Sequence, residues 1–535
     1  MTRDIAGWPQ ELASALHQVL CRKLPPSQGT EQELEPIVRK LLEATANGQL
    51  SITVDSADIE RIIYASGWLD PLTGPLVFSD GQLFWKRWHD ELRAVLDNLL
   101  QRMADRPLLP KPVTMIQDQN LSSEQQAAIN AIGRERLILL SGGPGTGKTS
   151  TVRGMLQRAW ALDPGLQIGL AAPTGKAARR LQHVIGNMPG AISCGTLHRW
   201  LQAHAKGFRR NARHPLNLDL LIVDEMSMVD LTLMRALLNA LPNWTYLVLV
   251  GDPDQLDPVG LGAVWRYLQQ PKVRKQFEKS LFHLQHIYRN QGDLTRLSAI
   301  LRDGGEKVFW NDLEIATKRQ SSSTISWYQE IKTSIPEVLQ NRLQLYRKTL
   351  EAAARGLDMA KIYESPSFAQ DLFEQLESLM VLCPRRHGRW SVESIHRELM
   401  LMPGVPTQQP FWPTGTPVIC MENQVDLDLA NGDLGVVIGD GAKQKILFGD
   451  AGKNNSPWTR LVHPTRLHKV ELAYAMTIHK AQGSEADNVV LLWPEVIASG
   501  DNPDQGRLLY TAITRARHHL QIITPPQTKA KGRSP

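Results

Sequence analysis

A glycine-rich stretch directly after a short apolar run constrains this chain more than any other feature of its sequence. The apolar run covers residues 137–140, the glycine-rich stretch covers 142–149, and a helical pattern follows. This is the GxxxxGK[ST] pattern in its required context of strand, loop and helix. The glycines let backbone N–H groups turn toward phosphate, and the helix N-terminus adds a favourable dipole. The stretch therefore predicts a nucleoside triphosphate site.

Individual residues of this loop predict separate contacts with a magnesium-bound triphosphate. Lys148 supplies a point charge to the β and γ phosphates, and the hydroxyl of Thr149 ligates Mg²⁺. A glycine-rich turn without a ligand is the alternative, and the complete pattern after a strand argues against it. The predicted phosphate-binding residues are Gly142, Gly143, Pro144, Gly145, Thr146, Gly147, Lys148, Thr149 and Ser150.

Two adjacent carboxylates follow another apolar run. Asp224 and Glu225 come directly after residues 221–223. We expect Asp224 to hold Mg²⁺, directly or through water, and Glu225 to polarise the attacking water. Taken alone, the pair could be a solvated strand end, but beside a P-loop it indicates an NTPase. These two elements do not decide what the hydrolysis drives, because many P-loop proteins share them.

Apolar runs that alternate with helical stretches predict the fold class. The clearest runs lie at residues 137–140, 167–172, 220–223 and 246–250. Buried strands separated by helices are typical of parallel α/β sheets. We therefore expect an α/β protein with one such domain over 121–291 and a second over 377–523. A helical bridge is predicted over 292–376, and a small inserted β-barrel at about 412–470.

The first 106 residues predict a small, mostly helical domain without catalytic motifs. Thr30 to Glu33 has the pattern of a capping box before a helix that ends near Gly48. Asp80-Gly81 marks a hairpin turn within residues 76–85, and a long amphipathic helix follows over 86–103. A proline-containing linker is predicted over 107–120, and a basic, disordered tail over 524–535.

The composition of the chain limits the kinds of partner, metal site and cellular location that we expect for it. The net charge of +6 suits a nucleic-acid partner without requiring one. Cys21, Cys194, Cys383 and Cys420 lie far apart, which argues against a disulfide framework and a zinc site. No run of about 18 apolar residues and no signal-peptide pattern is found. We expect a cytoplasmic protein without a membrane segment.

Segments on both sides of the P-loop resemble, in the correct order, the signature motifs of RecD-like superfamily 1 helicases. They begin with an adenine-reading Q motif and end with motif VI. The matching segments are residues 121–128, 172–178, 195–198, 224–228, 251–256, 288–289, 475–485 and 510–517. The resemblance implies two RecA-like motor domains with ATP and Mg²⁺ between them, so that hydrolysis opens and closes a cleft. It also implies single-stranded DNA as the track.

The resemblance assigns roles at the nucleotide. Gln255, at the end of a strand, can sense the γ-phosphate through its neutral amide. Arg289 and Arg515 are placed to act as arginine fingers, because a guanidinium fork matches phosphate geometry. A salt bridge is the alternative for each. The predicted catalytic residues are Lys148, Asp224, Glu225, Gln255, Arg289 and Arg515, with Gln125, Gln482, Gly483 and Glu485 as further nucleotide-binding residues and Thr149 and Asp224 as Mg²⁺ ligands.

A second set of residues is implied as DNA contacts. Contacts with the sugar–phosphate backbone carry no sequence preference, which suits a translocase. Each side chain could instead be a local cap or turn residue. The predicted DNA-binding residues are Pro173, Thr174, Thr196, His198, Phe208, Thr477 and His479.

Two insertions fit the same resemblance. Residues 205–214 form a basic loop with one aromatic, Phe208, where helicases of this type carry a pin that splits the duplex. Phe208 could stack on a base there, and a solvated basic loop is the alternative. Residues 415–435 resemble the small β-barrel that RecD-like helicases insert before motif V, with Asn431-Gly432 as a hairpin turn. A purely structural role is the alternative for this barrel.

The N-terminal domain favours one type of RecD-like protein. Stand-alone members have a long extension of helix–hairpin–helix repeats, whereas residues 75–78 and 83–88 resemble the RecC-docking domain of RecD subunits. The resemblance implies 5′→3′ motion on single-stranded DNA at double-stranded DNA ends, in a heterotrimer with RecB-like and RecC-like subunits. Such an exodeoxyribonuclease V acts in double-strand break repair and homologous recombination. By the same resemblance, its nuclease activity would belong to the RecB-like subunit, and no third constellation of carboxylates that would cut DNA is seen here.

Two other functions remain open at this point. One is a stand-alone RecD-like 5′→3′ helicase, which an active monomer without partners would support. The other is a DNA-binding ATP switch or loader that hydrolyses ATP without unwinding DNA. A P-loop kinase of small molecules is argued against by residues 477–485 and 510–517.

Overall fold

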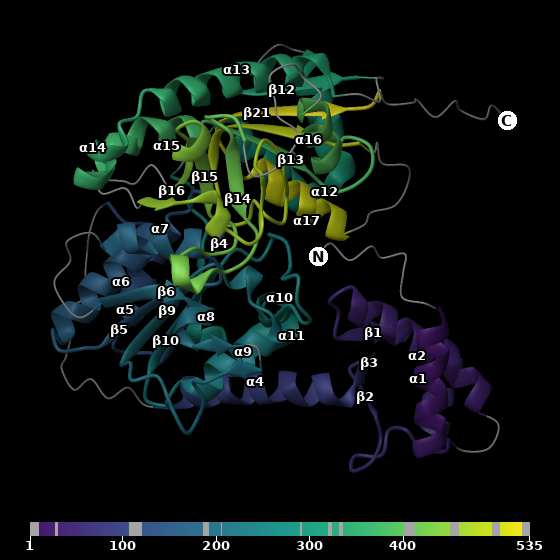
Figure 1. The fold of residues 1–535 in the computed structure, drawn as a ribbon. Helices are drawn as coiled ribbons and strands as arrows, with labels where there is room; N and C mark the ends of the chain where they lie inside the picture. The colour runs from purple at the N-terminus through teal and green to yellow at the C-terminus, as the bar shows by residue number, and fades with distance from the viewer. Residues whose placement is uncertain are drawn as a thin grey trace.

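The computed structural model describes residues 10–26, 30–105, 120–185, 192–204, 206–288, 292–318, 324–330, 335–400, 412–449, 459–494 and 503–526. Arg289, nearly all of the predicted linker 107–120 and most of the predicted tail 524–535 lie outside these ranges. Within them the chain forms a small N-terminal unit and two larger parts, each with its own parallel sheet (Figure 1).

The first parallel sheet has six strands in the order β11-β4-β10-β9-β5-β6, all pointing the same way. Its inner strands β4, β5, β9 and β10 are buried along their whole length, as strands covered on both faces must be. The strands are β4 (Leu137–Gly142), β5 (Ile168–Ala172), β6 (Ile192–Thr196), β9 (Leu220–Val223), β10 (Tyr246–Gly251) and β11 (Leu281–Leu284). The four apolar runs of the sequence are thus strands of one sheet.

Alternate residues of these strands enter two different cores. Leu137, Leu139 and Leu247 pack on one face, and Ile138, Leu140 and Val248 on the other, as the two-residue period of a strand requires. Helices α5 (Ser123–Ala131), α6 (Lys148–Leu162) and α7 (Gly175–Ile185) cover one face, and α9 (Leu231–Ala240) contributes to the other. Shorter helices are α8 (Leu197–Trp200), α10 (Val264–Leu268) and α11 (Pro271–Gln276).

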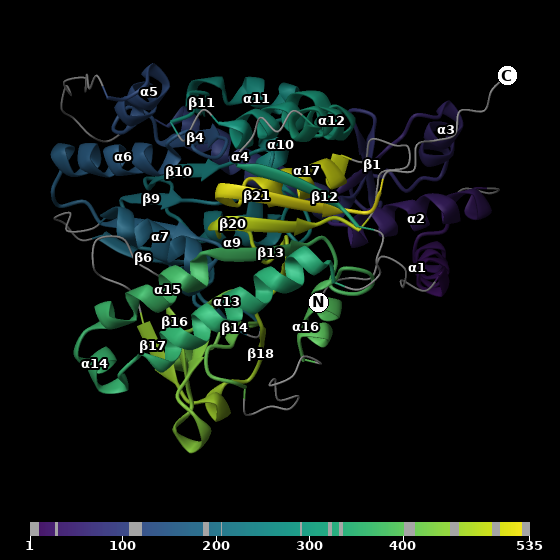
Figure 2. The same ribbon diagram turned by 90° about the horizontal axis from the view of Figure 1, so that it is seen from above.

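The second sheet is also parallel and has the order β12-β21-β20-β13-β19. Its strands are β12 (Ile325–Gln329), β13 (Leu379–Cys383), β19 (Met476–Thr477), β20 (Ala486–Leu492) and β21 (Ala516–Thr524). Met380, Leu382 and Leu491 face one core, and Val381, Cys383 and Val490 face the other. Figure 2 shows helices on both sides of these strands.

The segment predicted as a helical bridge, 292–376, belongs to this second sheet in the structure. Strand β12 pairs with β21, so the segment contributes a strand as well as helices. Helix α12 (Asp293–Lys318) packs against α17 (Pro503–Ile513) on one face, and α13 (Glu337–Arg355) and α15 (Gln370–Glu377) share the core of the other. The prediction of a separate bridge missed that a parallel sheet needs helices on both faces. The short helix α14 (Met359–Glu364) and helix α16 (Val392–Met400) complete this part.

The strand-rich insertion forms a five-stranded antiparallel sheet in the order β17-β16-β15-β14-β18. Its strands are β14 (Pro417–Cys420), β15 (Leu434–Ile438), β16 (Lys445–Gly449), β17 (Thr459–Val462) and β18 (Val470–Leu472). In the part of the chain that is described, β17 and β18 do not pair, so the ladder is not closed into the predicted barrel. Its inner side chains join the core of α13 and α15, which makes the insertion continuous with the second sheet.

The N-terminal unit packs three helices on a three-stranded antiparallel sheet of order β1-β3-β2. Its elements are α1 (Gln10–Lys23), α2 (Glu31–Ala46), β1 (Ser51–Thr53), α3 (Ala57–Ala65), β2 (Leu76–Ser79) and β3 (Gln82–Trp85), followed by the long α4 (Lys86–Ala104). The hairpin at Asp80-Gly81 and the helix after it are where the sequence predicts them. The capping box predicted at Thr30 is wrong, because its side chain makes no cap hydrogen bond.

Helix α4 fixes the N-terminal unit to the first parallel sheet. Leu92, Val95 and Leu99 enter the same core as α9, and Figure 1 shows α4 running beneath that domain. Arg102 is fully buried, and its guanidinium donates hydrogen bonds to the carbonyl oxygens of Pro242, Thr245 and Leu241 at 2.8–3.0 Å. Burial lowers the pKa of Arg102 to about 10, so the group stays charged at neutral pH.

The turn at Asn431-Gly432 also differs from the prediction. Gly432 has φ of 92° and lies in a turn, but β14 ends at Cys420 and β15 begins only at Leu434. The connection is therefore a longer loop with a short 3₁₀ helix, Val425–Leu427, and not a two-residue hairpin. In the residues that are described, no helix is long and apolar enough to cross a membrane.

Arg102→Met should destabilise the junction between α4 and the first sheet. The methionine keeps the apolar stem but removes three hydrogen bonds to buried carbonyl oxygens, which should cost about 3 kcal/mol of unfolding free energy. Urea unfolding followed by circular dichroism measures this. Arg93→Met, on an exposed position of the same helix, is the control and should change stability by no more than about 0.5 kcal/mol. An unfolding midpoint equal to that of the wild type in Arg102→Met would contradict the expectation.

Candidate active site between the two sheets

The P-loop leaves β4 and wraps toward the start of α6. Gly145 and Gly147 have φ of 75° and 82°, a region that favours glycine. The Nζ of Lys148 donates to the carbonyl oxygens of Gly142 at 2.7 Å and Gly143 at 2.9 Å, and the Thr146 hydroxyl donates to Gly143 at 2.8 Å. The loop is thus held in a turn by its own groups, with the ammonium of Lys148 folded over it. Thr149 and Ser150 lie in the first turn of α6.

Gln125 and Tyr288 close one side of this loop. Gln125 forms a capping box with Ser122 at the start of α5, and its Oε1 accepts a hydrogen bond from the hydroxyl of Tyr288 at 2.7 Å. The backbone N–H of Tyr288 donates to the carbonyl of Gly145 at 2.9 Å. A Cβ atom at Gly147 would lie 2.4 Å from Nε2 of Gln125, so only glycine fits there. This packing holds the Q-motif glutamine against the P-loop, beside a half-exposed aromatic ring.

The acidic pair sits at the end of β9. The backbone N–H of Glu225 donates to Oδ1 of Asp224 at 2.8 Å, and Glu225 has φ of 55°, a strained value for a residue with a side chain. Burial and the charge of Asp224 raise the pKa of Glu225, while Arg515, Lys148 and Arg180 oppose the rise. A carboxylate held near these cations with a raised pKa is suited to act as a general base.

The loop after β10 brings Gln255 to the same edge of the sheet. Gln255 is 5% exposed, and its Nε2 donates to Oδ2 of the buried Asp252 at 3.3 Å. Its Oε1 is buried without a hydrogen-bond partner. An orphaned acceptor at this depth is costly unless a ligand or water satisfies it. The geometry therefore suits the predicted role of Gln255 as a sensor of what occupies the cleft.

Arg515 reaches this edge from the second domain, at the point where α17 gives way to β21. It is 3% exposed, and its guanidinium donates to the carbonyl oxygens of Thr511 at 3.0 Å and Ser484 at 3.2 Å. These bonds hold the side chain in place without neutralising its charge. That charge acts on Glu225 of the first domain, where it lowers the carboxyl pKa. The structure thus brings Lys148, Glu225 and Arg515 together.

The other predicted nucleotide residues of the second domain lie at the domain boundary. Nε2 of the buried Gln482 donates to the carbonyl oxygen of Leu256 at 3.2 Å, so its amide contacts the first domain. Glu485 forms ion pairs with Arg180 at 3.4 Å and with Arg517 at 3.6 Å. The charges of Glu485, Glu225 and Asp224 raise the pKa of Arg180 despite partial burial. Sequence reasoning missed Arg180, because a cation on an amphipathic helix carries no motif.

Two of the predicted DNA-binding hydroxyls cap helices in the structure. Thr174, after Pro173 at the end of β5, accepts a hydrogen bond from the backbone of Ala177 at 3.3 Å. Thr196 accepts one from Arg199 at 3.2 Å and is the N-cap of α8. Both also stand at the carboxyl ends of strands in the first sheet. A Cβ atom at Gly483 would lie 3.4 Å from Oγ1 of Thr174, which places Gly483 of the second domain against this edge.

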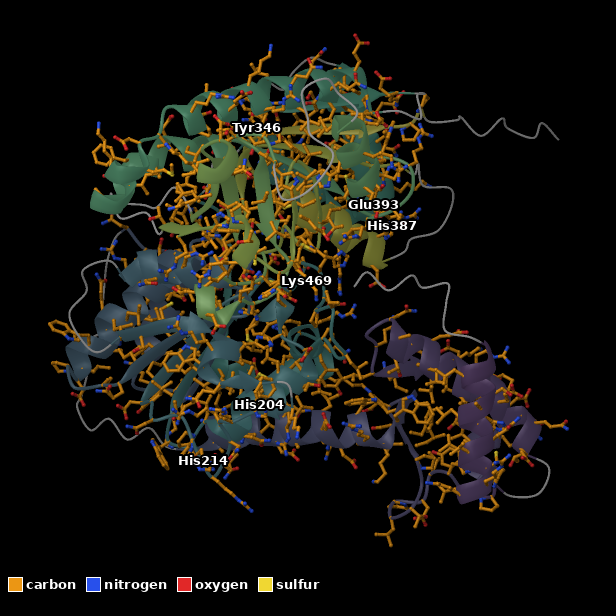
Figure 3. The ribbon with its side chains drawn as sticks, in the orientation of Figure 1. His204, His214, Tyr346, His387, Glu393 and Lys469 are labelled. Atoms are coloured by element: carbon orange, nitrogen blue, oxygen red, sulfur yellow. The ribbon has the colours of Figure 1, made fainter. Side chains whose placement is uncertain are left out.

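The basic loop after α8 is a short hairpin of β7 (Ala203–His204) and β8 (Gly207–Phe208). Phe208 lies at its base, packs against the first core and has its ring 6.1 Å from that of His198. Lys206 lies at the turn instead, so the aromatic is not at the tip of the predicted pin. Burial lowers the pKa of His198, which keeps the ring neutral at neutral pH. Figure 3 labels His204 and His214 on this part of the first domain.

Thr477 and His479 follow the edge strand β19 of the second sheet. Thr477 is 7% exposed, and its hydroxyl accepts a hydrogen bond from the backbone of Lys480 at 3.4 Å. His479 is exposed to solvent. Of the two, His479 is therefore the side chain that a strand of DNA can reach in this conformation.

The insertion touches the first domain beside Thr174. Two guanidinium nitrogens of Arg179 in α7 donate to the carboxylate of Asp433, whose side chain is fully buried. A Cβ atom at Gly175 would lie 2.4 Å from that of Ala430, so the loop before β15 rests directly on the start of α7. No motif predicted this contact between Arg179 and Asp433, which lie 254 positions apart.

Two family models match the chain. An AAA domain matches residues 125–261, and the C-terminal domain of UvrD-like helicases matches residues 472–523. The first match spans the strands that carry the P-loop, Glu225 and Gln255, and the second spans the segments of Gln482 and Arg515. The two matches thus coincide with the two halves of the site.

Relatives with known names cover most of the chain. The chain is 32% identical over 474 residues to RecBCD enzyme subunit RecD of Mycolicibacterium smegmatis, which covers 82% of this chain and 78% of that protein. It is 29% identical over 521 residues to the same subunit of Haemophilus influenzae, with 85% and 78% covered. The ATP-dependent RecD2 DNA helicase of Deinococcus radiodurans is 32% identical over 412 residues, with 74% and 48% covered.

Solved structures of Pif1 helicases are similar to the chain at lower identity. The crystal structure of Bacteroides Pif1 bound to single-stranded DNA is 17% identical, with a TM-score of 0.43 and with 77% of this chain and 93% of that chain covered. Two coordinating Pif1 helicases at forked double-stranded DNA give 17% identity, a TM-score of 0.41 and coverage of 78% and 95%.

Lys148→Gln should abolish ATP hydrolysis while the fold survives. The variant removes the ammonium group that folds over the P-loop but keeps a polar side chain of similar length at the start of α6. Phosphate release measures the turnover, and circular dichroism checks the fold. Lys279→Gln, at an exposed position of the same domain, is the matched control and should hydrolyse ATP as the wild type does. Normal turnover in Lys148→Gln would disprove the assignment of the P-loop.

Arg515→Ala should spare ATP binding and slow hydrolysis by about 10³-fold, as for other arginine fingers. Among the cations that lower the pKa of Glu225, the guanidinium of Arg515 has the largest effect, and it comes from the second domain. Its loss should therefore remove charge stabilisation from the transition state. Binding of a fluorescent ATP analogue and single-turnover hydrolysis separate the two effects. Arg466→Ala, on the exposed surface of the insertion, is the control. A loss of less than about tenfold would show that Arg515 is not a finger.

Proposed function

The chain belongs to the RecD family of DNA helicases, and from that premise we propose that it is the 5′→3′ motor subunit of a RecBCD-type enzyme. Its general activity is that of an ATP-dependent DNA helicase. The observation that carries the proposal is the meeting of Lys148 and Glu225 from one sheet with Arg515 from the other. A nucleotide held by both domains changes their separation when it is hydrolysed, and this movement is what a translocase needs.

Magnesium completes the proposed nucleotide site. Thr149, in the first turn of α6, and Asp224, at the end of β9, lie at the same edge of the first sheet. A hydroxyl and one carboxylate, with phosphate oxygens and water, make up a usual Mg²⁺ shell in P-loop proteins. These two residues would hold the ion, and the ion would neutralise charge that develops on the phosphates. Lys148 and Arg515 supply the remaining positive charge.

The extent of the similarity favours a subunit over a stand-alone helicase. Alignments with the RecD subunits cover 82% and 85% of this chain, whereas the alignment with RecD2 covers 74%. The same alignments span 78% of each RecD subunit but 48% of RecD2. The region shared with RecD subunits is therefore a larger fraction of this chain, and also a larger fraction of the relative, than the region shared with RecD2. We place RecB-like and RecC-like subunits as the partners in a heterotrimer.

The N-terminal unit is the proposed contact for the RecC-like subunit. Leu12, Val19, Tyr64 and Leu72 are large apolar side chains exposed on it, with Leu72 91% exposed. Leu12 and Val19 are seven residues apart on α1 and so share one face of that helix. Exposed apolar patches of this kind commonly mark protein–protein contacts. Helix α4 links this surface rigidly to the first motor domain.

We infer that the enzyme acts at double-stranded DNA ends in break repair and homologous recombination, in the bacterial cytoplasm. In the described residues, no cluster of three acidic, histidine or cysteine side chains is placed to hold a metal for nuclease chemistry. We propose that the nuclease activity of such an exodeoxyribonuclease V belongs to the RecB-like partner. This chain contributes the movement along the 5′-ended strand, with contacts at Thr174, Thr196 and His479.

The decisive experiment compares ATP hydrolysis by the full chain with and without an oligonucleotide of single-stranded DNA. We expect strong stimulation by DNA, and none in Lys148→Gln. Strand displacement from duplexes with a 5′ or a 3′ single-stranded tail then gives the polarity, and the 5′-tailed duplex should be unwound. Hydrolysis that ignores DNA, alone and with RecB-like and RecC-like subunits, would favour an ATP switch. Unwinding of the 3′-tailed duplex alone would overturn the polarity.

A further inference from the structure

Helix α17 of the second domain forms a hydrogen bond and an ion pair with the loop that follows β10 of the first domain. The backbone N–H of Leu256 donates to Oγ1 of Thr511 at 3.0 Å, while the Leu256 carbonyl accepts from Gln482 at 3.2 Å. Asp257, the next residue, pairs with Arg507 of α17 at 3.3 Å and with Arg266 of its own domain at 2.7 Å. The loop that carries Gln255 is therefore held by the second domain through both backbone and charge.

Tyr510 lies on the same helix and reaches deeper into the cleft. Its hydroxyl donates to Oδ2 of Asp252 at 3.3 Å, and a Cβ atom at Gly143 would lie 3.3 Å from this hydroxyl oxygen. Tyr510 is 4% exposed and Asp252 is 1% exposed. A single hydroxyl of the second domain thus bonds to the loop after β10 and lies beside the P-loop.

Asp252 connects this hydroxyl to Gln255. Its Oδ2 accepts from Nε2 of Gln255 at 3.3 Å and from Tyr510 at 3.3 Å, so one oxygen serves both donors. The other end of the Gln255 amide, Oε1, is buried without a partner. If the amide turns to a γ-phosphate or its attacking water, Asp252 loses a donor and depends more on Tyr510.

The hydroxyl of Tyr510 remains a donor throughout this exchange. Burial and the charges of Asp252 and Asp254 raise its pKa well above the usual value, so the phenol does not ionise at working pH. The ring itself packs in the core of α12 and α17. Thr511 and Arg507 already hold α17 on the loop. The hydrogen bond from the Tyr510 hydroxyl to Asp252 is an additional polar contact between the two domains.

We propose that Tyr510 is a positioning residue that passes the state of the γ-phosphate from Gln255, through Asp252, to helix α17. The inference rests on the proposed motor function and adds a specific route between its two domains. When Gln255 engages the γ-phosphate, the bond from Tyr510 holds α17 closed on the P-loop. When the phosphate leaves, Gln255 returns to Asp252 and shares the same oxygen with Tyr510, which weakens the hold of this hydroxyl while Thr511 and Arg507 keep the helix docked. Tyr510 touches no substrate, and its effect is on the coupling of hydrolysis to DNA.

The test is Tyr510→Phe, which removes only the hydroxyl, in the full chain with its partner subunits where these are needed for DNA binding. Turnover and the KM for ATP are measured with and without a saturating single-stranded oligonucleotide. We expect DNA-stimulated turnover to fall about tenfold, the effect of one hydrogen bond to a buried carboxylate. The KM for ATP should change less than about threefold, because the phosphate-binding groups remain in place.

Tyr346→Phe is the matched control. Tyr346 is a buried tyrosine of the same domain whose hydroxyl donates to the carbonyl of Leu376 at 2.8 Å. Figure 3 shows it on α13, away from the first domain. This variant removes a buried hydroxyl without touching the proposed route, so its DNA-stimulated turnover should equal that of the wild type.

A double-mutant cycle with Gln255→Ala tests whether Tyr510 acts through Gln255. Once the amide is gone, adding Tyr510→Phe should lower stimulated turnover by no more than about twofold further. Full additivity, an unchanged stimulation in Tyr510→Phe, or an equal loss in Tyr346→Phe would each overturn the role of Tyr510. Wild-type hydrolysis that ignores DNA would overturn the motor function and this inference together. If DNA stimulates the wild type and one of the three results above is found, only the role of Tyr510 is overturned.

Discussion

The site depends on the charges that surround one buried glutamate. Burial and the neighbouring Asp224 raise the pKa of Glu225, and the cations that lower it are Arg515, Lys148 and Arg180. Lys148 and Arg180 belong to the first domain and Arg515 to the second. The presence of Arg515 beside the cleft therefore lowers the pKa of this carboxyl and favours its ionised form, together with Lys148 and Arg180.

Parallel sheets explain how residues far apart in the sequence arrive at this glutamate. Every strand of a parallel sheet ends at the same edge, so the P-loop after β4, the acidic pair after β9 and Gln255 after β10 meet there without any local sequence relation. In the second domain, Arg515 lies between α17 and the start of strand β21 and reaches the same cleft. Between the two edges, the backbone of Leu256 is bonded to Thr511 and Gln482, which gives the moving domains a defined point of contact.

Features with a repeated residue pattern, or with a strict chemical requirement, could be predicted from the sequence. Contacts between individual residues that are far apart in the chain could not. The P-loop and the buried strands of the first sheet were predictable, because phosphate binding needs glycines and two-sided burial needs apolar runs. Residues 292–376 were predicted as a bridge, because the helices that cover a sheet look alike whether or not they belong to it. Arg180 and Tyr510 gain their importance from what lies opposite them in space. The capping pattern at Thr30 failed for a similar reason, since a cap depends on the backbone geometry at the helix start.

Helix α7 of the first domain interacts with both the insertion and the acidic pair after β9. It begins beside Thr174, whose hydroxyl caps its first turn, and it carries Arg179 and Arg180 side by side. Arg179 is paired with Asp433 of the insertion, and Arg180 with Glu485 of the second domain. Because both partners move with the second domain, a displacement of α7 changes both ion pairs together. The charge of Arg180 acts on Asp224 and Glu225, so the helix that Thr174 caps also carries a cation that interacts with the acidic pair after β9. The acidic pair and the insertion of the second domain are thus connected through a single helix of the first domain.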